Sequence, residues 1–394
     1  MFSERLPTEL TPNRLTSAVA ALRAAGRAFV DLTLSNPTRA GFIYPRDLLA
    51  PLADEAALGY APSPLGAPQA RAAISADYAR QGFDVPTDRI VLAASTSDAY
   101  SMLFKLLANA GDDVLIPRPS YPLFDQLARL DLVAARPYDL DIHGGWSIDV
   151  ASVERALTPR TRAVLIVSPN NPTGSFVGAE EFDRLASLCA PRQIAIIADE
   201  VFADYELTPG AASCAGRAVV RRDALTFALG GLSKSAGLPQ VKLGWMAVSG
   251  PDDVVGSALE RLEHIADTYL SVSTPVQLAA ALLLERGAAI RAQIASRVSA
   301  NYATLGAIGS ETASCRVVPS GGGWYAVLQV PSLEPEDDLV VRLLTEDAVL
   351  VHPGFFFDFP REAFLVVSLL PPTDVFADGI GRVLRHFDCA VGRA

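Results

Sequence analysis

Short apolar runs alternate with helical patterns through the middle of the chain. Four of these runs end at polar, proline or glycine residues and are expected to be buried strands, at 90–93, 113–117, 163–167 and 194–198. Helical periodicity lies between them, at 97–107, 121–130 and 179–188. Alternating strands and helices are typical of βαβ units, so the sequence predicts an α/β fold with a mostly parallel sheet covered on both faces.

The pattern changes after residue 245. Two helical stretches, at 252–266 and 274–308, precede short strand patterns at 316–318, 323–330, 348–352 and 363–369 and a helix at 336–346. This tail resembles a compact α+β unit with its own sheet. We therefore expect an N-terminal arm that contributes to a small domain at 1–45, a large domain at 46–285 and the rest of the small domain at 286–394.

Composition and charge exclude several classes of partner. Half of the 394 residues are hydrophobic and 20% are charged, which allows a large core. A net charge of -11, with no run of Lys or Arg, argues against a nucleic acid or an anionic membrane. The first ten residues lack a signal-peptide pattern and no 18-residue apolar run occurs, so a cytoplasmic protein is expected. The four Cys and four His residues show no metal-binding spacing, so no metal site is predicted.

Lysine is unusually scarce. Only Lys105, Lys234 and Lys242 occur among the 33 basic residues, and two of them lie eight positions apart. A buried lysine can lose its proton and form an imine, which an arginine cannot do. The segment around Lys234 and Lys242 is therefore a candidate site, although three residues can also lie this way by chance.

Polar residues follow three of the expected strands, where ligands of parallel sheets bind. Ser95-Thr-Ser97 precedes a helix and can offer hydroxyl and N–H groups to a phosphate. Residues 168–174 form an Asn- and Pro-rich turn, and Asp199 ends an apolar strand. Taken singly, these are more ordinarily a helix cap, a turn and a strand end. Their joint occurrence with the lysine segment favours a site.

These residues resemble the class I/II aminotransferases among the fold-type I pyridoxal-phosphate-dependent enzymes. The matching landmarks follow the order of that family: Tyr60 with Gly66, Ser95-Thr-Ser97, Pro119-Ser-Tyr121-Pro122, Asn171-Pro-Thr-Gly174, Asp199-Glu-Val201, Ser233-Lys234 and Gly244-Trp245. A single one of these motifs is weak evidence, whereas the ordered set spans most of the chain.

The resemblance implies a role for each matching residue. Lys234 forms the internal aldimine with pyridoxal 5'-phosphate, Asp199 pairs with the pyridine nitrogen, and Tyr121 stacks on the ring. Asn171 bonds the phenolic oxygen of the ring, with Phe202 close by. The phosphate is held by Ser95, Thr96, Ser97, Ser233 and Lys242. Tyr60 reaches the site from a second subunit, which implies a homodimer.

The implied activity is amino-group transfer between an amino acid, or a related amine, and a 2-keto acid. Two other hypotheses stay open at this point. One is a pyridoxal-phosphate enzyme of another reaction type, such as a lyase, a decarboxylase or an oxidase. The other is a non-catalytic binding or regulatory module.

The sequence departs from the family pattern at several positions. Lys242, Phe202 and Gly231 stand where the family commonly has Arg, Tyr and Ser. A more consequential change is Val366, which stands where the family generally has an Arg that clamps the substrate carboxylate. Candidates for a replacement substrate contact are Asn36, Arg39 and Arg361, of which the arginines are equally expected to be solvated surface residues.

Overall fold

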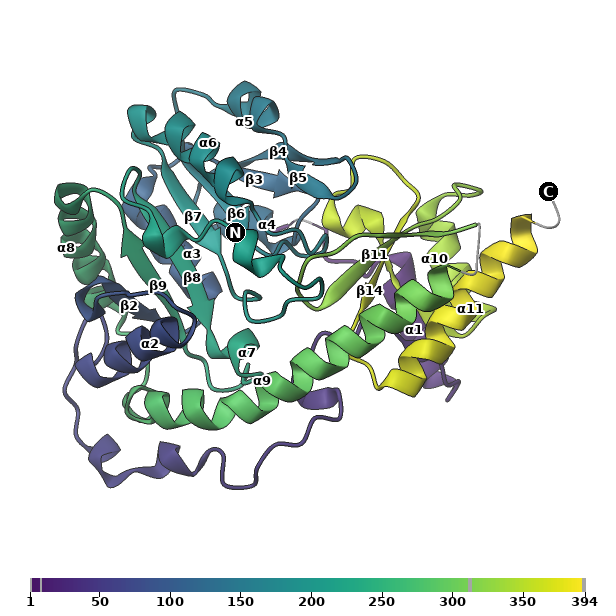
Figure 1. The fold of residues 1–394 in the computed structure, drawn as a ribbon, viewed down its shortest axis with the longest axis horizontal. Coiled ribbons are helices and arrows are strands. Elements are labelled where there is room, and N and C mark those ends of the chain that lie inside the picture. Colours follow the sequence, from purple (N-terminus) through teal and green to yellow (C-terminus); the bar gives the residue numbers. More distant parts are fainter. Residues whose placement is uncertain (1, 8, 311–313, 392–394) are drawn as a thin grey trace.

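The computed structural model describes residues 2–7, 9–310 and 314–391, the last three of these by their backbone alone. Two sheet-containing domains lie side by side, joined by one long helix (Figure 1). Both the α/β class and the additional small domain predicted from the sequence are confirmed.

The large domain is built on an eight-stranded sheet of order β2-β9-β8-β7-β6-β3-β4-β5. Its strands are β2 (Ile90–Ala93), β3 (Asp113–Arg118), β4 (Ala134–Ile142), β5 (Trp146–Ile148), β6 (Thr161–Val167), β7 (Ala195–Asp199), β8 (Thr226–Gly231) and β9 (Gly244–Ser249). The pairs from β8 through β4 are parallel, whereas β9 is antiparallel to both neighbours and β5 is antiparallel to β4. The prediction of a mostly parallel sheet is therefore confirmed.

Helices cover both faces of this sheet because alternate strand residues point to opposite sides. Leu165 belongs to the core on one face and Ile166 to the core on the other. The first core includes side chains from α3 (Thr96–Leu107), α4 (Leu123–Leu130) and α8 (Asp252–Tyr269). The second includes side chains from α2 (Pro68–Arg80), α5 (Val150–Ala156) and α6 (Ala179–Cys189).

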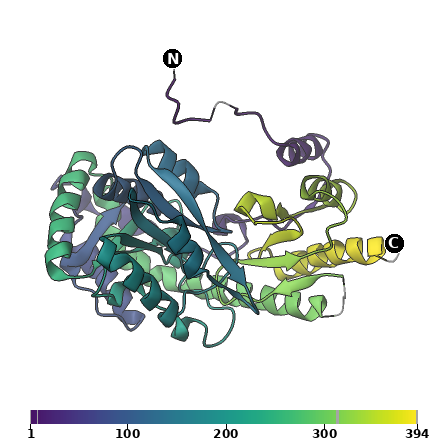
Figure 2. The same ribbon diagram turned by 90° about the horizontal axis from the view of Figure 1, so that it is seen from above.

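The small domain joins both ends of the chain, as expected. Its antiparallel sheet has the order β10-β11-β14-β13 and is formed by β10 (Arg316–Val318), β11 (Tyr325–Gln329), β13 (His352–Pro353) and β14 (Phe364–Ser368). Near the N-terminus, β1 (Val30–Asp31) pairs in parallel with β12 (Val349–Leu350). Figure 2 shows α1 (Arg14–Ala24), α10 (Glu336–Thr345) and α11 (Thr373–Val391) on this side of the molecule.

A single strand was expected at 348–352, but the structure has two. One of them, β12, pairs with β1, and the other, β13, pairs with β14. Val349, Leu350 and Val351 form one buried apolar run that spans β12 and reaches the start of β13. It therefore carries no sign that the pairing partner changes.

The helix α9 (Thr274–Gly309) has 36 residues and runs from below the large sheet to the small domain (Figure 1). The domain boundary expected after residue 285 falls inside this helix. Gly287 makes its packing possible, since a Cβ there would lie 2.5 Å from the Cβ of Ala236. The helix thereby approaches the segment that follows Lys234 closely. None of the described helices has both the length and the apolar character that a membrane span requires.

Candidate active site

A cavity of about 550 Å³ lies at the carboxyl ends of β6 and β7, beside the first turn of α3. Its wall combines Val167 and Asp199, from the large sheet, with Tyr325 and His352, from the small-domain sheet. Carboxyl ends of parallel strands are where such sheets bind ligands. This cavity is the candidate active site.

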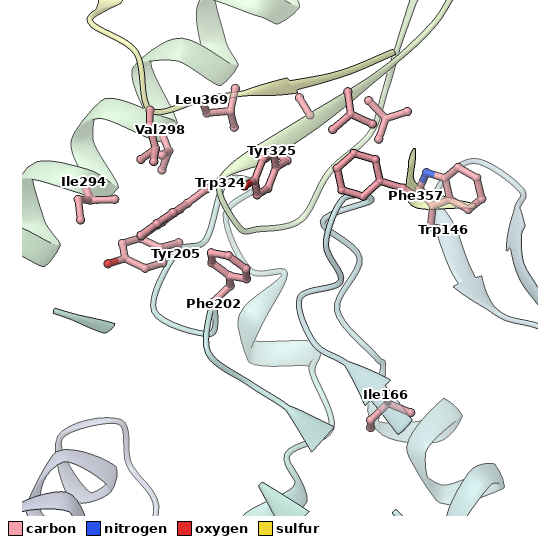
Figure 3. Close-up of a cluster of buried hydrophobic side chains, with 14 of the residues drawn as sticks. Trp146, Ile166, Phe202, Tyr205, Ile294, Val298, Trp324, Tyr325, Phe357 and Leu369 are labelled. Atoms are coloured by element: carbon pink, nitrogen blue, oxygen red, sulfur yellow. The ribbon is translucent and has the colours of Figure 1, made fainter. Parts of the chain in front are cut away.

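Lys234 lies in α7 (Leu232–Ser235), a single helical turn that directly follows β8. Its backbone carbonyl accepts a hydrogen bond from the Tyr205 hydroxyl. Its Nζ lies 4.9 Å from the centroid of the Trp324 ring and 5.4 Å from that of Phe202, and Figure 3 shows these three aromatic residues grouped together. Burial lowers the pKa of Lys234 to about 8, while the charge of Asp199 acts in the opposite direction. The neutral amine, which can act as nucleophile or base, is therefore accessible near physiological pH.

Asp199 ends β7 at the floor of the cavity and is 8% exposed. It accepts hydrogen bonds from the Tyr100 hydroxyl at 3.1 Å and from the Val201 N–H at 3.2 Å. Burial raises the pKa of this carboxyl to about 6, although both hydrogen bonds and the charge of Lys234 oppose the rise. A buried carboxylate that remains ionised at pH 7 is suited to pair with a cationic ring nitrogen.

Two adjacent asparagines have different surroundings. The Asn170 amide donates to the Pro119 carbonyl at 3.1 Å, and its Oδ1 accepts from the Ser120 hydroxyl at 3.2 Å. These bonds hold the loop that carries Tyr121, a half-exposed ring in the cavity wall. Asn171 also lines the cavity, but its buried Oδ1 has no hydrogen-bond partner within the described residues. An unsatisfied buried amide at a cavity wall is a position that a ligand can satisfy.

The turn before α3 presents N–H and hydroxyl groups to the cavity. Ser95 caps the helix by accepting from the Asp98 N–H at 3.1 Å, and the Asp98 carboxylate accepts from the Ala94 N–H at 2.9 Å. The first-turn N–H groups of Thr96 and Ser97 lack partners inside the helix. A helix N-terminus of this kind attracts phosphate.

The strand β9 lies close against this turn. A Cβ on Gly244 would come 2.9 Å from the carbonyl carbon of Ser95, so only glycine allows this approach. Lys242, two residues earlier, has a positive φ of 62° and lines the cavity together with Ser233. The Lys242 cation and the Ser233 hydroxyl therefore line the same cavity as the N-terminus of α3, although they come from a different part of the chain.

The structure brings most of the candidate cofactor residues to one cavity. The candidates in its wall are Ser95, Thr96, Ser97, Tyr121, Asn171, Asp199, Phe202, Ser233, Lys234 and Lys242. Tyr60 is not among them: it is 75% exposed and lies beside Gly66 in a separate surface hollow.

The three candidate substrate residues are not in the cavity wall either. The Asn36 side chain accepts from the N–H and hydroxyl groups of Thr38, which caps a short turn. Arg39 is exposed, and the Arg361 guanidinium lies over the Phe364 ring at 5.5 Å. The expectation that either arginine replaces the missing clamp is thus not supported by this arrangement.

Several wall residues had no role in the sequence interpretation. Tyr100 contacts Asp199 directly, and Tyr325, His352 and Phe356 come from the small domain. The aromatic run at 355–357 is a weak local signal that Phe356 has a role in the site. The others could not be found from local pattern, because the elements that bear them are distant in sequence from the strands they meet.

The donor set fits pyridoxal 5'-phosphate. The helix N-terminus with Lys242 suits the phosphate, and Asp199 suits the ring nitrogen. The partnerless amide of Asn171 suits a ring oxygen. Lys234, with its lowered pKa, suits a carbonyl carbon.

Comparison with known proteins agrees with a site for pyridoxal 5'-phosphate. The profile of the family described as aminotransferase class I and II matches residues 50–375. An alanine aminotransferase from Mycobacterium tuberculosis is 30% identical over 383 residues, which cover 92% of this chain and 86% of that protein. The glutamate-pyruvate aminotransferase AlaA of Escherichia coli is 26% identical over 362 residues, covering 90% and 89%.

Solved structures share the fold. An alanine aminotransferase from Pyrococcus furiosus superposes with a TM-score of 0.86 at 22% identity, covering 98% of this chain and all of that one. An aminotransferase from Escherichia coli gives a TM-score of 0.83 at 24% identity, covering 98% of both chains.

Proposed function

Since this chain belongs to the aminotransferase class I and II family and is a pyridoxal-phosphate-dependent aminotransferase, we propose that Lys234 is its cofactor-binding and proton-transferring residue. The amino group passes between an α-amino acid and a 2-keto acid. The observation that carries the assignment is that Lys234, Asp199 and Asn171 line one cavity.

Pyridoxal phosphate, when bound, supplies a carbonyl carbon for amines and a ring that accepts the electron pair left on the substrate α-carbon. The residues of the protein hold the cofactor and orient it. The N–H groups of Thr96 and Ser97 and the Lys242 charge bind the phosphate. Asp199 keeps the proton on the ring nitrogen, and the Tyr100 hydroxyl holds that carboxylate in place.

Lys234 moves the proton. Its neutral ε-amino group would take the proton from the substrate α-carbon and deliver it to the cofactor carbon that receives the amino group. Phe202 and Trp324 flank the Nζ and limit the access of water. Both the lowered pKa of Lys234 and the apolar flanks follow from the same burial.

Absorption spectroscopy tests this assignment. With added pyridoxal phosphate, the wild type should develop a visible band that Lys234→Ala lacks, and that band should bleach on addition of an amino donor with release of the keto acid. Lys105→Ala, which removes a surface lysine, is the matched control and should behave as the wild type. An undiminished Lys234→Ala band would refute the assignment.

The names of the relatives suggest the first donors to try. The protein from Mycobacterium tuberculosis is named for alanine, and the one from Escherichia coli for glutamate and pyruvate. We therefore propose L-alanine and L-glutamate as donors, with pyruvate and 2-oxoglutarate as acceptors. Keto-acid release from each donor–acceptor pair, measured with a coupled dehydrogenase, shows which donor and which acceptor the protein uses.

A homodimer is the proposed active unit. Ile43, Leu58 and Tyr60 are each at least 75% exposed on a segment that runs along the outside of the large domain (Figure 1). Exposed apolar surface marks protein–protein interfaces where it is contiguous, and a second subunit packed on this segment would bury these three side chains. Sedimentation velocity should give twice the 41.7 kDa chain mass, and Tyr60→Ala should weaken cofactor binding. A fully active monomer would contradict the proposal.

A further inference from the structure

One end of the cavity carries no cationic group from the protein. Lys234 and Lys242 are the cations in the cavity wall, and within the described residues no arginine contributes to it. The small domain supplies Tyr325, His352 and Phe356 to that wall, and Ser35 adds a hydroxyl. A substrate carboxylate directed toward this end meets neutral groups.

The sheet register shows what stands beside Val366. His352 lies directly opposite Val366 in the antiparallel β13–β14 pair, and Tyr325 lies opposite Ser368 in the β11–β14 pair. Residues that are directly opposite project from the same face of a sheet. Val366 is fully buried and is not in the cavity wall, whereas His352, its neighbour on that face, is.

The His352 ring is oriented by the protein but makes no hydrogen bond within the described residues. Phe357 packs against it edge-on, with centroids 5.7 Å apart at 81°, and Phe356 lies 6.0 Å away. Burial lowers the pKa of His352 to about 4, and the charge of Asp31 opposes this only in part. The ring is therefore neutral at pH 7 and carries one N–H donor, and His352 lines the cavity.

Two hydroxyls accompany this imidazole in the wall. Tyr325 is nearly buried and keeps its proton, since burial raises its pKa, and the Ser35 side chain lies close enough to act on that pKa. Ser35, from the loop after β1, Tyr325, from β11, and His352, from β13, thus place three neutral groups that can donate hydrogen bonds in the cavity wall. Hydrogen bonds from neutral donors can hold a carboxylate, with less energy than a bidentate guanidinium provides.

We propose that His352 is a specificity-determining residue that donates its ring N–H to the substrate carboxylate, together with the hydroxyls of Tyr325 and Ser35. The site then takes α-amino acids through neutral donors. This inference rests on the proposed aminotransferase function. It assigns substrate binding to a position that has no role in holding the cofactor.

The test uses full-length protein loaded with pyridoxal phosphate. Bleaching of the visible band is followed at increasing L-alanine or L-alaninamide, which differ in the charge of the group at the carbonyl carbon. His352→Phe removes the donor, His352→Gln retains a neutral donor, and His143→Phe changes an exposed histidine of the β4–β5 hairpin as a control.

The expected result is a selective loss. His352→Phe should raise the half-saturating concentration of L-alanine by about tenfold or more, while the limiting rate changes by less than about threefold. The effect on L-alaninamide should be about threefold or less, because a bond to a carboxylate is charge-assisted and a bond to an amide is not. His352→Gln should restore most of the affinity, and His143→Phe should match the wild type.

Other outcomes overturn the inference. Equal losses for the two donors, or an unchanged half-saturating concentration for L-alanine, would show that His352 does not bind the carboxylate. If His352→Phe fails to fold, as judged by thermal unfolding, Tyr325→Phe should show the same selectivity for the carboxylate, and its absence would refute the inference. A wild type whose band responds to no donor refutes the proposed function itself, and the inference falls with it.

Discussion

The Tyr100 hydroxyl donates a hydrogen bond to the Asp199 carboxylate across 3.1 Å, although the two residues are 99 positions apart in the sequence. Tyr100 comes from α3, whose first turn is the proposed phosphate site, and Asp199, the proposed partner of the ring nitrogen, ends β7. The hydrogen bond thereby joins a helix and a strand in the wall of the cavity. This contact should influence both the charge of the carboxyl and its position.

Removing that hydroxyl should weaken cofactor binding. Tyr100→Phe leaves Asp199 with one fewer donor, so its pKa rises further above about 6 and less of it is ionised at pH 7. Affinity for pyridoxal phosphate should fall about fivefold, as measured by absorbance titration. The matched control is Tyr138→Phe, which deletes a buried hydroxyl that donates to the Leu165 carbonyl at 2.7 Å in the same domain. It should reduce stability to urea without altering affinity, and equal affinities in all three proteins would contradict the prediction.

The pKa of Lys234 should be visible in the stability of the cofactor-free protein. The pKa of this lysine is about 8 in the folded protein and 10.5 in the unfolded chain, so between these pH values the unfolded state binds one more proton. Wild-type stability should therefore rise with pH from 8 to 10.5 relative to Lys234→Met, by about 2 to 3 kcal/mol. Urea unfolding of both proteins across this range measures the difference. A difference that does not vary with pH would show that the lysine is not desolvated.

The two adjacent asparagines should respond in opposite ways. Asn171→Ala removes a buried oxygen without a partner, so the cofactor-free protein should lose no stability, while affinity for pyridoxal phosphate falls about tenfold. Asn170→Ala breaks the bonds to Pro119 and Ser120 and should lower the unfolding free energy by about 2 kcal/mol. Urea unfolding of the two variants measures the contribution of each asparagine to stability, and cofactor titration measures its contribution to binding. Loss of stability in Asn171→Ala would contradict this division.

Space at Gly244 should limit the phosphate site. In Gly244→Ala the new methyl group would meet the Ser95 backbone at 2.9 Å, which displaces the turn before α3 and should weaken cofactor affinity by at least about tenfold. Gly256→Ala, in α8 with open space around it, should instead stabilise the protein by about 0.5 to 1 kcal/mol. Titration of both variants with pyridoxal phosphate tests the contrast. Wild-type affinity in Gly244→Ala would mean that the turn can move freely.

Much of the large domain could be predicted because its signals are local. The strands at 90–93 and 163–167 are apolar runs that stop at polar turns, and the structure confirms both as β2 and β6. The strands β4, β5, β8 and β9 were not predicted. In β4 the apolar residues are interrupted by Arg136, Pro137 and Asp139, and β5 has only three residues. The strands β8 and β9 border the glycine-containing segment around Lys234, where the short apolar runs do not stand out.

Long-range packing accounts for the differences elsewhere. The helix α9 continues through the expected domain boundary, because helical periodicity does not depend on which domain a turn packs against. The expected strand at 348–352 is divided between two partners, β1 and β14, because a run of apolar residues does not show which strand each residue pairs with. In each case the local pattern predicts the type of element correctly, but it contains no information on the domain or strand with which that element packs.

The sequence by itself determined which chemistry is available. Asp199 and Asn171 each lie at or just after the end of an expected strand, and such ends converge at one edge of a parallel sheet, so their joint use was predictable. Lys234 was identified instead by the scarcity of lysine and by the family resemblance, because the strand before it was not predicted. Only the tertiary structure decided that Tyr100 holds Asp199, that His352 stands beside Val366, and that Arg39 and Arg361 lie away from the cavity. These relations depend on how separate layers and domains pack, and packing between elements distant in sequence leaves no periodic trace in the chain.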